Sequence, residues 1–284
     1  MSAAQAQPKG ARKSPQKLSV NALLVAPLKV RWHAACGLWH NHGCWRVPAL
    51  RMRLKTELLR EMSETIPIIL VLSAIAAIMI FIVLPASLRE QAETILRGLW
   101  PIWVVQAAPM ICAQVLAMAN APAIALRLVE LQALGHFSQA DNGQALPAEA
   151  LARRVAALAI PQIGAHAVLC AACACLLVMF TLVFGILAEF VLAVGDVRSV
   201  LTTILASTSP LAWMRSIFQA AVLGAMCAGA AVLFAWPGSQ SAERAKDTHR
   251  IGVFAMISAS VACALAGLAM NWVAGLLGWN PNAI

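Results

Sequence analysis

The sequence predicts an all-α integral membrane protein, with five transmembrane helices preceded by an interfacial amphipathic helix. Hydrophobic residues make up 61% of the 284 positions and charged residues only 12%, whereas a soluble domain has about 25% charged residues. The charged residues are also arranged so that five long uncharged stretches remain between them. A soluble domain is therefore excluded, because so few charges cannot cover an aqueous surface.

Each of the five uncharged stretches is long enough to cross a ~30 Å hydrocarbon core as a helix that rises ~1.5 Å per residue. The third stretch would be roughly 51 Å long as a single helix, which is too short for two spans and a turn. We therefore expect one long or tilted helix there rather than a re-entrant pair. The predicted spans cover residues 66–86, 99–126, 155–188, 213–236 and 251–279.

Basic residues divide the chain into two parts and indicate its orientation. Residues 1–48 form a polar, basic arm that we expect to be disordered, and residues 49–284 form the membrane domain. With a cytoplasmic N-terminus, 17 of the 21 Lys and Arg residues lie inside and 4 outside. This positive-inside pattern predicts a multi-pass protein of the cell inner membrane, with a cytoplasmic N-terminus and a periplasmic C-terminus. The basic arm fits anionic lipid or the cytosol better than nucleic acid.

Residues 51–64 predict the amphipathic helix that precedes the first span. Leu54, Leu58 and Met62 recur at helical spacing, while the basic residues and three Glu residues, Glu61 among them, fall mostly on the other faces. Such a helix can lie in the inner membrane interface. The alternative is an ordinary cytosolic helix that packs on the rest of the protein.

The inner loop after the second span, residues 127–154, is long for a connector. Its first part continues the helical pattern, with Leu128, Leu131 and Leu134 on one side, and Pro147 can open a new helix further on. A short helix in a cytosolic loop is available to a docking partner. A plain connector remains the alternative, because loop length alone does not decide between them.

The basic arm also holds a dense group of ligand-type residues. Imidazoles and thiols suit Zn²⁺ or Cu⁺, but their spacing here fits no standard zinc ribbon or finger. A membrane-embedded metal-binding or enzymatic protein that uses this group is therefore a second hypothesis, and a non-transporting assembly factor is a third. The group consists of His33, Cys36, His40, His42 and Cys44.

The spans themselves contain few ionisable residues, and some have a Trp residue at one end. His166 lies near the inner end of the third span and Glu189 near its outer end. Glu189 is a candidate residue of an outer mouth, because a carboxylate within a membrane is a functional candidate by default; headgroup level is the alternative position. Trp100 and Trp236 lie at span ends, where indoles favour the membrane interface.

The stretch from Pro109 to Arg154 resembles the MlaE-type permease family, the membrane subunit of MCE-associated lipid ABC transporters. In that family a proline and small residues occupy the second half of span two, here PMICAQVLAMANAPAIAL. A cytoplasmic coupling helix, a loop that ends in a proline and a short basic run follow. The segments RVAALAIP and SAERAKDTHRIGVF are similar to the family's leads into spans three and five. The resemblance extends over residues 50–279 and is to a divergent member, since an acidic coupling-helix position falls near Gly135.

The resemblance implies a homodimer that encloses a lipid-sized cavity, a cytoplasmic ABC ATPase and an MCE-domain substrate-binding protein on the outer side. It implies phospholipid or another hydrophobic molecule as substrate, and no catalytic residue, metal or cofactor in this chain. The implied ATPase-coupling loop comprises Leu128, Glu130, Leu131, Leu134, Phe137, Asp141, Pro147, Arg153 and Arg154.

Overall fold

The computed structural model describes residues 48–83, 92–134, 148–192, 197–236 and 248–276, together with Cys36. These segments are almost entirely helical, and none of them contains a strand. Five helices are long and apolar enough to cross a membrane, which confirms the predicted number of spans. They cover Leu54–Val83, Leu96–Ala133, Ala150–Ala188, Pro210–Phe234 and Arg250–Leu276.

The five spans are built from long α-helices, two of which contain a short π-helical segment. The third span is one continuous helix of 45 residues, as expected. The short helix α4 continues directly into η5 and forms the first part of the second span, and α7 is a short helix between the third and fourth spans. The elements are α2 (Pro48–Ala77), η3 (Ile78–Val83), α4 (Ala92–Ile102), η5 (Trp103–Ala107), α5 (Ala108–Ala133), α6 (Ala148–Leu192), α7 (Val197–Ser207), α8 (Pro210–Phe234) and α10 (Thr248–Leu276).

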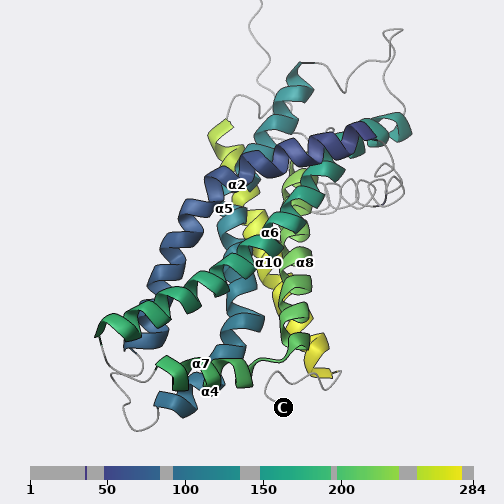
Figure 1. Cartoon of the computed structure of the whole chain (residues 1–284). Coiled ribbons are helices and arrows are strands. Elements are labelled where there is room, and N and C mark those ends of the chain that lie inside the picture. Colours follow the sequence, from purple (N-terminus) through teal and green to yellow (C-terminus); the bar gives the residue numbers. More distant parts are fainter. Residues whose placement is uncertain are drawn as a thin grey trace, which may run out of the picture.

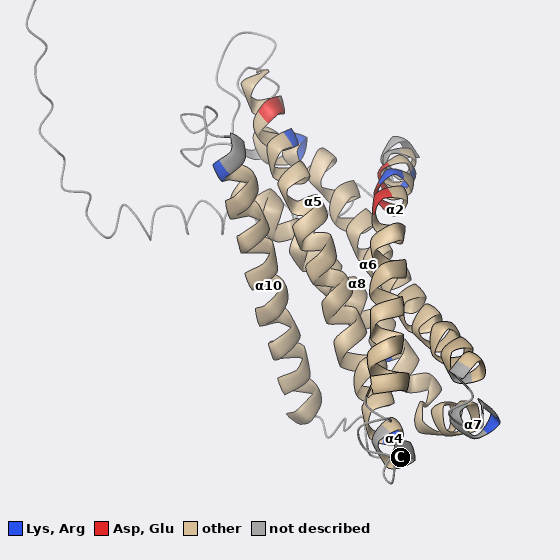
Figure 2. Cartoon of the chain, turned by 90° about the vertical axis from the view of Figure 1, so that its left-hand side faces the viewer, with Lys and Arg blue, Asp and Glu red and all other residues tan. Residues whose placement is uncertain are grey.

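The helices form one bundle in which α6 and α8 lie at the centre (Figure 1). Helix α6 packs against α2 on one side and α8 on the other, while α5 packs against α8 and α10. Lys, Arg, Asp and Glu gather at the two ends of the bundle, and its middle is formed by other residues (Figure 2). This distribution is the one expected of a bundle whose middle lies in hydrocarbon.

Small residues allow the central helices to approach closely. In α5, Ala113, Ala117, Ala121 and Ala125 recur every fourth residue and are all buried, so they form one stripe facing the bundle. The neighbouring Ala119 lies on the exposed side of the same helix. The alanine-rich composition therefore contributes to packing only on one face.

A proline in the second span is compensated by a side chain from a neighbouring helix. Pro109 has no N–H to donate to a carbonyl in the preceding π-helical turn. The buried Ser216 hydroxyl of α8 donates a hydrogen bond of 2.6 Å to the Val104 carbonyl in that turn. This bond satisfies a polar backbone group that cannot be left open inside a membrane bundle.

The indole of Trp100 contributes to protein packing and does not face lipid. Trp100 is 1% exposed, and its ring meets Phe81 edge to face, with the centroids 6.0 Å apart. Trp236 is buried as well. These two indoles therefore contribute apolar area to the core instead of facing lipid, and their depth in the membrane stays a prediction.

Helix α2 runs in two directions. Its first half lies across one end of the bundle, and its second half descends along α6 (Figure 1). We call residues 48–66 the lead-in segment. Its half-buried Leu58 and Met62 pack on the core, whereas Met52 and Leu59 are exposed. The segment thus has the crosswise orientation of an interfacial helix, and part of its apolar stripe is covered by protein.

Candidate functional site at the charged end of the bundle

The predicted coupling residues of α5 lie at the end of the bundle where the lead-in segment crosses it (Figure 1). They differ widely in exposure. Leu128 is buried, Leu131 is half-buried and packs on the core, and Leu134 is 69% exposed. Glu130 is exposed too. The end of α5 therefore leaves Glu130 and Leu134 exposed, while Leu128 is a packing residue.

The other predicted coupling residues are divided between the start of α6 and the segment before it. Arg153 and Arg154 lie in the second turn of α6 and are exposed. Phe137, Asp141 and Pro147 lie outside the described residues. The structure thus brings the two flanks of the predicted coupling loop to the same end of the bundle.

Two further predictions fall where the structure describes little. Glu189 belongs to the last turns of α6, but its side chain is outside the described part, so its role in an outer mouth stays a prediction. Of the His/Cys group in the basic arm, only Cys36 is described, and it is exposed. The other four members of the group lie outside the described residues.

A carboxylate of the lead-in segment joins this segment to α5. Glu57 pairs with Arg127 of α5 and, at 2.7 Å, with Arg60 one turn further along its own helix. The Glu57 side chain is only 12% exposed, whereas both arginine side chains are about half exposed. Because ion pairs at such a surface contribute only about 0–1 kcal/mol, these pairs add little stability to the bundle.

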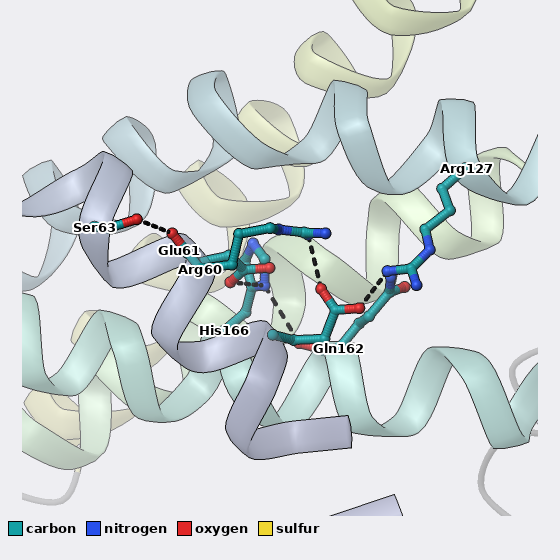
Figure 3. A network of polar contacts seen from close by, with 7 residues as sticks. Arg60, Glu61, Ser63, Arg127, Gln162 and His166 are labelled. Atoms are coloured by element: carbon teal, nitrogen blue, oxygen red, sulfur yellow. Dashed lines mark hydrogen bonds and ion pairs between the residues drawn. The ribbon is translucent and has the colours of Figure 1, made fainter. Parts of the chain in front are cut away.

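A second carboxylate joins the lead-in segment to α6, and this contact is fully buried. The Oε2 atom of Glu61 lies 3.1 Å from Nδ1 of His166, and the two side chains are 3% and 1% exposed. The same nitrogen lies 3.2 Å from the Gln162 carbonyl oxygen. With a proton on Nδ1, His166 can donate to that carbonyl, and the Glu61 carboxyl lies within reach of the same nitrogen (Figure 3).

The backbone at His166 is itself held in place by α8. Gly224 packs so closely against α6 that an added Cβ would lie 2.5 Å from the His166 carbonyl oxygen and 2.6 Å from Cβ of Cys170. Only glycine permits this approach of two helices. His166 is therefore a fixed point of the bundle, to which Glu61 attaches the lead-in segment.

Sequence reasoning missed the role of Glu61. The expectation that the glutamates of residues 51–64 lie mostly on the exposed faces is wrong for Glu61, which is 2% exposed. It holds for Glu64, which is exposed. The available signal was incomplete: a lone His in an apolar span needs a polar partner, but the sequence does not say which residue supplies it.

The cysteines of the spans line the contacts between helices. The Cys227 thiol of α8 lies 3.5 Å from the Ala113 carbonyl of α5 and 3.8 Å from the Ala259 carbonyl of α10. Cys112 and Cys170 are fully buried among apolar neighbours. Within the described part of the chain, no three His, Cys, Asp or Glu side chains are grouped to hold a metal ion.

These features define a polytopic α-helical membrane protein with a polar junction at one end. The junction consists of Glu57, Glu61, Arg127 and His166, which connect three helices (Figure 3). No protein-family model matches the chain, and a search of curated proteins returns no match.

Proposed function

We propose that the chain is the permease subunit of an ABC transporter that moves phospholipid or another hydrophobic molecule across or out of the inner membrane. A separate cytoplasmic ATPase supplies the energy, and an MCE-domain protein exchanges substrate on the periplasmic side. The permease works as a homodimer. This proposal rests on the resemblance to the MlaE-type family and on the architecture described above.

One observation carries the proposal furthest. The two helix ends that flank residues 135–147 lie at the end of the bundle crossed by the lead-in segment, and this segment is bonded to both helices. A motor bound to the flanks, at Glu130, Leu134 and Arg153, would therefore act on three connected helices. The middle of the bundle is uncharged (Figure 2), which suits acyl chains, because apolar contact is favourable there and ion binding is costly.

The docking site is tested by changing its most exposed apolar side chain. We expect Leu134→Asp to abolish co-purification of an ABC ATPase from solubilised native membranes, since a charge would replace an apolar contact in the interface. Leu205→Asp in α7 is the matched control, because this leucine is 66% exposed at the opposite end of the bundle. The readout is mass spectrometry of proteins retained by the tagged chain.

The result distinguishes an error in the proposed function from an error in the proposed docking site. If the unaltered chain retains no ATPase, the proposed function is wrong. If the ATPase is retained equally well by Leu134→Asp and the unaltered chain, transport remains the proposal, but docking at Leu134 is refuted. Leu131→Asp is a poorer test, because Leu131 packs on the core and its replacement would also disturb folding.

The orientation is tested with reporter fusions. A fluorescent protein fused after Leu134 is expected to fluoresce, and alkaline phosphatase fused after Ser207 is expected to be active, because these positions lie at opposite ends of the bundle. The reverse pattern would place the proposed docking end outside the cell membrane. No cytoplasmic ATPase could then reach it.

A further inference from the structure

The lead-in segment ends at a point where α2 is built to bend. Ser63 donates a hydrogen bond of 2.7 Å to the Arg60 carbonyl, and Thr65 donates one of 2.7 Å to the Glu61 carbonyl. Hydroxyls that bond back onto the preceding turn bend helices. Pro67 follows directly inside the same helix, and proline removes a backbone donor and kinks the chain. Three bending features thus fall within five consecutive positions.

The contacts that hold the lead-in segment lie just before this bend. Glu57 and Glu61 are one helical turn apart, and each reaches a different helix of the bundle. Beyond them, Leu58 and Met62 add apolar contacts, while Met52 and Leu59 face outward. Polar and apolar contacts together therefore hold the segment at its angle to the bundle.

We propose that the lead-in segment is a hinged element, which pivots at Ser63–Pro67 and is held in the observed position by a two-point latch, Glu57–Arg127 and Glu61–His166. The inner contact, Glu61–His166, is anchored to α6 and α8 through His166. The outer contact, Glu57–Arg127, is anchored to α5 near the flank of the predicted coupling loop. Release of the outer contact frees the far end of the segment first, because the Arg127 side chain is accessible to solvent. This inference does not depend on an ATPase partner.

The latch is tested by measuring the distance between spin labels on the segment and on the bundle. Labels are placed at Met52 and Met118, which are 72% and 53% exposed, in a chain whose accessible cysteines have been replaced, reconstituted in lipid nanodiscs. The unaltered chain is expected to give one narrow distance distribution. The double substitution Glu57→Gln and Glu61→Gln is expected to broaden it at least about twofold, since the ion pair of Glu57 with Arg127 is lost and an amide replaces the buried carboxyl beside His166.

Glu64→Gln is the matched control, because Glu64 lies on the same segment, carries the same group and is exposed; it should leave the distribution narrow. Adding Pro67→Ala to the double substitution should narrow the distribution again if the pivot lies at Ser63–Pro67. Should the double substitution fail to fold, Glu57→Gln alone tests the outer contact and should broaden the distribution partly. A distribution that is already broad in the unaltered chain, or one that stays narrow without the latch, would overturn the proposal.

Discussion

Gly224→Val is expected to destabilise the bundle severely. Even the Cβ atom would lie 2.5 Å from a backbone carbonyl of α6, and backbone cannot rotate away as a flexible side chain can. The two added methyl groups would then force α6 and α8 apart. Overpacking of this kind costs about 3 kcal/mol. Thermal unfolding in detergent, followed by size-exclusion chromatography of the heated protein, should show the loss.

Gly229→Val in the same helix is the matched control. A Cβ at Gly229 would meet no atom within 4 Å, so this substitution should leave the midpoint of unfolding close to that of the unaltered chain. Equal stability of the two variants would show that α6 and α8 do not approach each other closely at Gly224.

His166→Leu is expected to cost about 1–3 kcal/mol of folding free energy, because removal of one partner of a buried polar contact leaves the other without a partner. Here the remaining group is the carboxyl of Glu61, which is 2% exposed. Restoring an apolar contact should recover most of the loss, since a buried pair can be replaced by hydrophobic residues with little net cost. The double variant Glu61→Leu with His166→Leu should therefore unfold at a higher temperature than His166→Leu alone.

The same measurement distinguishes the buried contact from the surface one. Arg127→Gln removes a partner of Glu57 that is 44% exposed, so its effect on the melting temperature should be small. If Arg127→Gln lowered the melting temperature as much as His166→Leu does, the Glu57–Arg127 pair would contribute far more stability than the exposure of Arg127 indicates. A negligible effect of His166→Leu would contradict the importance of the Glu61 contact.

The spans were predictable because each depends on a local property of the chain. Some twenty or more consecutive residues without charge predict a membrane helix whatever surrounds them, and the 45 residues of α6 confirm that the third stretch is one helix. The approximate ends of the helices follow from where charged residues and prolines begin. None of this needs knowledge of which helices are neighbours.

The polar junction could not be predicted in the same way. The glutamates at 57, 61 and 64 occur in a short run of mixed charge, and only the bend of α2 and the path of α6 decide that Glu61 is buried and Glu64 is exposed. Leu128 and Leu134 likewise share a predicted side of one helix, yet only Leu134 is largely exposed. Helix α5 extends beyond its neighbouring helices between these two positions, so the burial of the two leucines differs. The composition of a helix face does not reveal where a neighbouring helix ends.

The length of α6 has a mechanical consequence. Forty-five residues make a rod of about 68 Å, more than twice the thickness of the hydrocarbon core. If such a rod rocks by about 10° around its midpoint, each tip travels roughly 6 Å, whereas a helix just long enough to cross the core would move its tips by less than half as much. Modest rocking of α6 would thus be amplified into larger displacements at its two ends.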